Sequence, residues 1–125
     1  MFGFLGRFGR ARELRHLDDA LRAVDLHPAM VPDAVELTTV RFLKNARGTP
    51  QPQDYAEAAE LIAYCMIGAE GFAGANDEAR ALAVEDRIER ALEAGDSLDA
   101  QIILLLLHAE IIQPSVIAQF RLEQG

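Results

Sequence analysis

Apolar residues in this chain recur at intervals of three and four along segments that end at proline or glycine. In residues 12–25, the side chains of Leu14, Leu17, Leu21 and Val24 fall on one stripe of a helix. No stretch shows the strict alternation of a half-buried strand, and none carries a hairpin turn between two candidate strands. The pattern therefore predicts an all-α protein.

Prolines, glycines and capping residues predict where the other helices begin and end. His27-Pro28 closes the first helix, because proline lacks a backbone donor and restricts the residue before it. Further helices are expected over residues 32–47, from Pro52 into 61–67, from an Asn76 cap to Gly95, from an Asp96 or Ser97 cap through 98–112, and from Pro114 onward. Short connections favour a compact bundle of about five main helices plus a short C-terminal helix.

Two of these helices are apolar on nearly every side. The helix that contains residues 61–67 is expected to end among Gly68, Gly71 and Gly74, or to use these glycines to admit another backbone closely. Residues 102–107 are expected to form the central core helix. The surrounding segment is shorter than the roughly 20 apolar residues of a bilayer span, and it contains charged side chains.

The length of 125 residues suits one domain with one hydrophobic core. We expect residues 11–125 to form a single helical domain, preceded by an apolar and basic arm at residues 1–10. Cys65 is the one cysteine, so an internal disulfide is excluded. The start of the chain has no continuous apolar stretch with a cleavage site, which makes the cytoplasm the expected compartment.

Charge is distributed unevenly along the chain. The net charge of -8 argues against a nucleic-acid partner, because affinity for phosphate backbones comes from clustered Lys and Arg. Residues 1–47 carry eight basic and six acidic side chains, a balance of +2, so the remainder carries -10. This asymmetry fits subunits that meet basic face to acidic face, or two faces that complement each other within one monomer.

The first ten residues have the most unusual composition in the chain. They combine apolar and basic side chains, with no acidic residue before Glu13. We predict that this arm binds a protein partner or a second subunit, through Phe2, Phe4, Leu5, Phe8, Arg7 and Arg10. Two alternatives stay open: an arm that folds back on its own core, and weak peripheral contact with an anionic membrane surface.

His108 and Cys65 are the candidate ligand residues. His108 lies one turn after Leu104 and one before Ile112, which suggests a histidine at the edge of the core. Cys65 has no nearby cation in its apolar run, so inert packing is expected unless a base such as His108 comes from another helix. The sequence carries no metal-ligand pattern and indicates no cofactor.

Acidic side chains cluster on two of the expected helices. Glu57 and Glu60 share a helix face with Tyr64, and paired carboxylates are able to do acid-base work, but a solvated face is the simpler interpretation. The same interpretation applies to the next helix, whose acidic residues are Glu85, Asp86, Glu89 and Glu93. Asp86 and Arg90 are spaced for a weak exposed ion pair.

The leading functional hypothesis is a small helical module for protein-protein interaction or self-assembly, since the arm and the charge asymmetry both favour a macromolecular partner. The alternative is a bundle that binds a small molecule or a metal, with or without enzymatic activity, at a pocket near His108.

Overall fold

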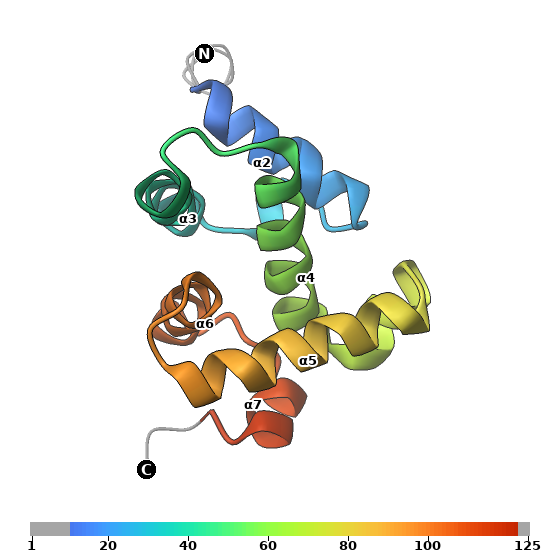
Figure 1. Ribbon diagram of the computed structural model, residues 1–125. Helices are drawn as coiled ribbons and strands as arrows, with labels where there is room; N and C mark the ends of the chain where they lie inside the picture. Colours follow the sequence, from blue (N-terminus) through green and yellow to red (C-terminus); the bar gives the residue numbers. More distant parts are fainter. Residues whose placement is uncertain (1–10, 123–125) are drawn as a thin grey trace.

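The structure is a computed structural model that describes residues 11–122. These residues form six α-helices and one 3-10 turn, with no strand among them (Figure 1). The helices are α2 (Arg12–Ala23), α3 (Asp33–Arg47), α4 (Pro52–Ala75), α5 (Glu78–Ala94), α6 (Leu98–His108) and α7 (Pro114–Phe120), and the turn η1 (Pro28–Met30) lies between α2 and α3. The predicted all-α fold class is confirmed.

Helix α4 is the centre of the fold. It packs against α2, α3, α5, α6 and α7, and its residues 61–65 are all buried. In Figure 1, α2 and α3 lie beside its upper part, and α5 crosses its lower part. The prediction that residues 102–107 form the central helix is wrong. Leu104 is 48% exposed, because α6 buries one side only, through Ile102, Ile103 and Leu106.

A break at Gly68 divides α4 into two parts. Gly68 has φ 87° and ψ 170°, a backbone conformation that is essentially restricted to glycine. The helix then resumes and ends at Ala75, beyond all three glycines at which we expected it to stop. A Cβ at position 68 would lie 3.3 Å from Cγ of Gln113, so this glycine does admit another segment closely.

The helix caps agree with the sequence pattern at most positions. Ser97 caps α6 by accepting a hydrogen bond from the N–H of Ala100, and Gly95 ends α5 in the left-handed conformation. The cap of α5 differs from the prediction, because Asp77 accepts from the N–H of Arg80. Asn76 instead donates to the carbonyl oxygen of Val24, which ties the end of α4 to the end of α2.

Candidate interaction surface

Two arginines of α5 pair with carboxylates on neighbouring helices. Arg80 donates to Glu60 of α4 through Nε and Nη2. Arg87 forms a two-pronged contact with Asp99 of α6, with Nε 3.1 Å from Oδ2 and Nη2 2.9 Å from Oδ1. These contacts join α5 to α4 and α6, and they leave Arg90 as the one exposed arginine of α5.

Arg87 is the most enclosed charged group of this network. Its side chain is 16% exposed, and Nη2 also donates to the backbone oxygen of Glu57 at 3.1 Å. Nη1 is also buried. It lies 3.6 Å from Oε1 of Glu60 and forms an ion pair with it, but no hydrogen bond. Burial lowers the pKa of Arg87, but the hydrogen bond and charge of Asp99 outweigh it and raise the pKa overall. The guanidinium is therefore a fixed charge that holds three helices together.

The expectation that Glu57, Glu60 and Tyr64 form a solvated face is wrong. Glu60 accepts from Arg80 and faces Arg87, and Tyr64 is fully buried. The hydroxyl of Tyr64 donates to Oε2 of Glu85 at 2.6 Å. Burial, and then this hydrogen bond, raise the pKa of Tyr64 well above its ordinary value. These groups fasten α4 to α5 and do not form an exposed pair of carboxylates.

The outward side of α5 combines carboxylates with exposed leucines. Leu82 is 62% exposed and Leu92 is 46% exposed. They belong to the α5 outer stripe, defined as Glu78, Leu82, Glu85, Glu89 and Leu92, whose members follow one another at intervals of four, three, four and three residues. This spacing keeps them on one face of the helix, in the pattern of a helical contact seam.

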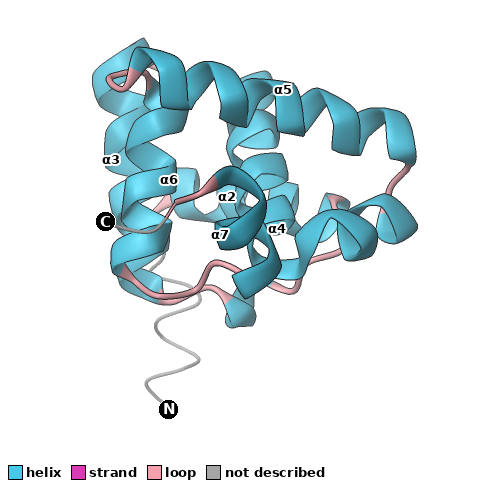
Figure 2. Ribbon diagram, turned by 90° about the horizontal axis from the view of Figure 1, so that it is seen from below, coloured by secondary structure: helices cyan, strands magenta, loops and turns pink. Residues whose placement is uncertain are grey.

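This face is acidic because Arg80 and Arg87 pair with carboxylates of other helices and do not neutralise the carboxylates of the stripe. Glu78 and Glu89 are exposed and have no hydrogen bond or ion pair with any residue in the range 11–122. The predicted pair of Asp86 and Arg90 is present, with 3.0 Å between Oδ2 and Nε, beside the stripe. In Figure 2, α5 runs along one edge of the molecule with no described helix beyond it. The stripe is therefore an acidic and apolar surface that faces outward, except at Glu85, which is half-buried and held by Tyr64.

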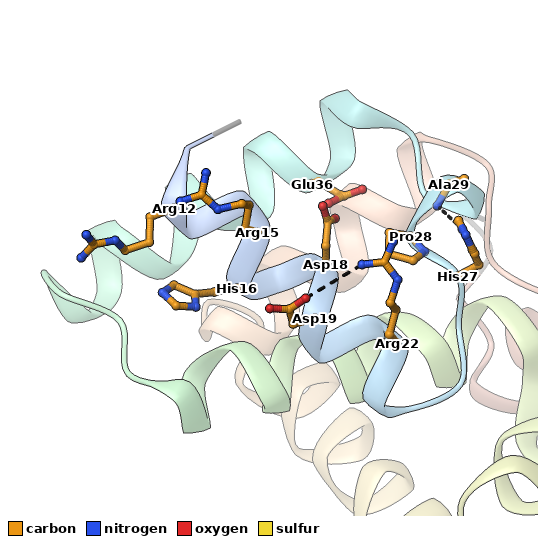
Figure 3. Close-up of a pocket in the computed structure, with 10 residues that line it drawn as sticks. All are labelled: Arg12, Arg15, His16, Asp18, Asp19, Arg22, His27, Pro28, Ala29 and Glu36. Atoms are coloured by element: carbon orange, nitrogen blue, oxygen red, sulfur yellow. Dashed lines mark hydrogen bonds and ion pairs between the residues drawn. The ribbon is translucent and has the colours of Figure 1, made fainter. Parts of the chain in front are cut away.

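A second feature is a groove with a volume of about 560 Å³ between α2, η1 and α3. Charged side chains of both signs line it (Figure 3). They are Arg12, Arg15, Arg22, Asp18, Asp19 and Glu36, joined by His16 and His27. Arg22 lies 3.9 Å from Asp19, and Nδ1 of His27 accepts a hydrogen bond from the N–H of Ala29. The charges balance, so the groove favours neither anions nor cations.

The candidate ligand residues do not come together. His108 is exposed at the last residue of α6, not at the edge of the core, because the α6 face that bears it and Leu104 points away from the other helices. Cys65 is completely buried in α4, and burial raises the pKa of its thiol to about 12. Neither residue lines the groove on α2 or a smaller cavity of about 180 Å³ beside Arg87.

The predicted partner-binding residues Phe2, Phe4, Leu5, Phe8, Arg7 and Arg10 lie outside the described residues. The sequence alone did not point to Leu82 and Leu92, because they are interspersed with acidic residues typical of a solvated face. The signal that identifies them is the spacing of four and three residues through Glu78, Leu82 and Glu85, on a face of α5 that lies beside its buried stripe.

The described residues contain no group of three or more His, Cys, Asp or Glu side chains arranged to hold a metal ion. Among them, no helix has the length and apolar character that a membrane span requires. Comparison with protein-family models, curated proteins and solved structures finds no match to this chain.

Proposed function

We propose that this chain is a helical self-assembly module, in which the α5 outer stripe of one copy receives a basic and apolar surface of a second copy. The observation that carries the proposal is the exposure of Leu82 and Leu92 within a row of carboxylates. Exposed apolar side chains on one helix face, rimmed by charge, are typical of a protein-binding surface.

Charge supports a partner that is basic. The outward acidic side chains of α5 outnumber its one exposed arginine, whereas residues 1–47 carry a balance of +2. Opposite charges on two copies steer their association, and Leu82 and Leu92 supply apolar contact area whose contribution salt does not screen. The proposed self-assembly is thereby assigned to a specific surface, the α5 outer stripe.

The test is the native mass of the chain, measured by size-exclusion chromatography with light scattering over a range of protein concentrations. We expect a concentration-dependent oligomer that weakens at high salt, because salt screens the charged part of the contact. Replacing Leu82 and Leu92 by serine removes about 3 kcal/mol of apolar burial, which raises the dissociation constant about 100-fold.

The matched control is Leu37→Ser on α3, since Leu37 is 52% exposed and lies away from α5. Leu37→Ser leaves the native mass unchanged if the α5 outer stripe is the contact. If Leu37→Ser weakens the oligomer as much as the double variant does, exposed leucines contribute to association wherever they lie, and the α5 outer stripe is not the specific contact. A monomer at every concentration would remove the proposal.

A second candidate function is binding of a small polar molecule in the groove between α2, η1 and α3. The observation in its favour is the volume of about 560 Å³, within the roughly 300–1,000 Å³ usual for ligand sites. Because both signs of charge line the groove, we propose a zwitterionic ligand. Thermal unfolding in the presence of free amino acids tests this: a stabilisation lost in the variant with Arg12→Ser and Asp19→Ser supports it, and no stabilisation contradicts it.

A further inference from the structure

The α5 outer stripe restricts what is able to occupy it. Leu82 and Leu92 are ten residues apart, about 15 Å along the helix axis, and the exposed carboxylates of the stripe belong to Glu78 and Glu89, because Glu85 is held by Tyr64. An occupant that fits must place apolar side chains near both leucines and positive charge near Glu78 and Glu89. A purely apolar segment would leave these carboxylates without compensating charge, and a purely basic one would leave the leucines in water.

Most basic side chains of the described part of the chain already have acidic neighbours. Arg22 faces Asp19, and Lys44 lies 3.8 Å from Glu13. The other pairs are Arg47 with Asp54, Arg80 with Glu60, Arg87 with Asp99 and Arg90 with Asp86. These arginines and this lysine are poor sources of the charge that the stripe requires.

The first ten residues of the chain have the required composition. They combine three phenylalanines and Leu5 with Arg7 and Arg10, and they contain no acidic residue. Three glycines, at positions 3, 6 and 9, lower the steric cost of fitting a backbone against a helix. The composition therefore complements the stripe in both apolar character and charge.

We infer that residues 2–10 of one copy occupy the α5 outer stripe of a second copy, with the phenylalanines against Leu82 and Leu92 and the arginines against Glu78 and Glu89. This inference rests on the proposed self-assembly and names the segment that carries it. If two copies exchange their segments reciprocally, the contact closes into a two-fold dimer.

A charge-swap experiment on the full chain tests the inference. One variant carries Arg7→Glu and Arg10→Glu, and the other carries Glu78→Arg and Glu89→Arg, two exposed positions of the stripe. Each variant alone places like charges opposite each other, so we expect its dissociation constant to rise about 10-fold or more. Mixed in equal amounts, the two variants have opposite charges at both contacts and should recover the native mass of the wild type.

The native mass of the mixture and of each variant is read by light scattering, and circular dichroism verifies that each variant is helical. Recovery on mixing supports the inference. If Arg7→Glu with Arg10→Glu keeps the wild-type mass while Leu82→Ser with Leu92→Ser does not, another part of the second copy occupies the stripe, and only the inference fails. If the wild type is monomeric, the inference and the proposed function fail together.

Discussion

The backbone N–H of Gln113 donates a 2.7 Å hydrogen bond to the carbonyl oxygen of Cys65, across the break in α4. The side-chain amide of Gln113 lies 3.4 Å from the carbonyl oxygen of Ile67, the residue before Gly68. The segment between α6 and α7 thus supplies donors to carbonyl groups that lose their helical partners where α4 is interrupted.

Replacing Gly68 by alanine should destabilise the protein, because a side chain is strained at φ 87° and would lie against Gln113 and Ser115. The expected loss in the free energy of unfolding is about 1–3 kcal/mol, measured by urea denaturation. Gly74→Ala is the matched control in the same helix, since no atom lies within 4 Å of the added carbon. It should stabilise the protein by up to about 1 kcal/mol. Equal effects of the two changes would contradict this role of Gly68.

Replacing Arg87 by alanine should lower the free energy of unfolding by about 2–3 kcal/mol, because Asp99 loses its partner and Glu60 loses one of its two arginines in a half-buried setting. The matched control is Arg90→Ala on the same helix. Arg90 forms an exposed pair with Asp86, so its loss should cost no more than about 0.5 kcal/mol. Urea denaturation of both variants checks the difference. Similar losses would show that Arg87 does not hold the helices together.

Acid should weaken the start of α4 through Asp54. The hydrogen bond from the N–H of Gln51, aided by Arg47, holds the pKa of this carboxyl below its ordinary value. Because the pKa is lower in the folded state, the stabilisation is present above about pH 4 and is lost as the pH falls further.

In the Asp54→Asn variant this contribution is absent at every pH. We expect the variant to be less stable than the wild type by about 1 kcal/mol at pH 7. The two proteins should converge in stability as the pH falls below about 4. Urea denaturation at pH 7 and pH 3 measures both differences, and a gap that does not narrow in acid would exclude the proposed role of Asp54.

Cys65 should resist thiol reagents in the folded protein. It is completely buried, and burial raises its pKa to about 12, so at pH 8 it is neither accessible nor ionised. Reaction with a chromogenic disulfide should be at least about 1,000-fold slower than in the urea-unfolded chain, since it requires opening of the core. Rapid reaction without denaturant would reopen the possibility of a functional thiol.

Much of the fold could be predicted because local signals suffice for helices. The stripe of Leu14, Leu17 and Leu21 on α2, the capping residue Ser97 and the terminating Gly95 all act within one or two turns of the chain. The role of α6 could not be predicted in this way. A run of leucines is compatible with burial on all sides, and only the positions of the neighbouring helices decide that Leu104 faces outward.

The same limit applies to the candidate site. Glu60 and Arg80 are twenty residues apart in the chain, and no local pattern indicates that they meet. Sequence spacing placed Glu57 and Glu60 on a polar face of α4, but it could not show that arginines from α5 cover that face. The leucines of the α5 outer stripe become conspicuous only when the inward side of α5 is known.

The break at Gly68 has a consequence for the surface of α5. The last turns of α4, residues 69–75, lead directly into α5, so the backbone at Gly68 sets the direction in which α5 crosses the molecule. The direction of the outer stripe is thus determined by the buried Gly68 and by Gln113, which donates to the carbonyl oxygens of Cys65 and Ile67 beside it. Neither Gly68 nor Gln113 belongs to that surface. A change at either position leaves the residues of the stripe themselves unchanged, so a binding defect that maps there is expected to come from the orientation or the stability of α5 and not from a lost contact residue.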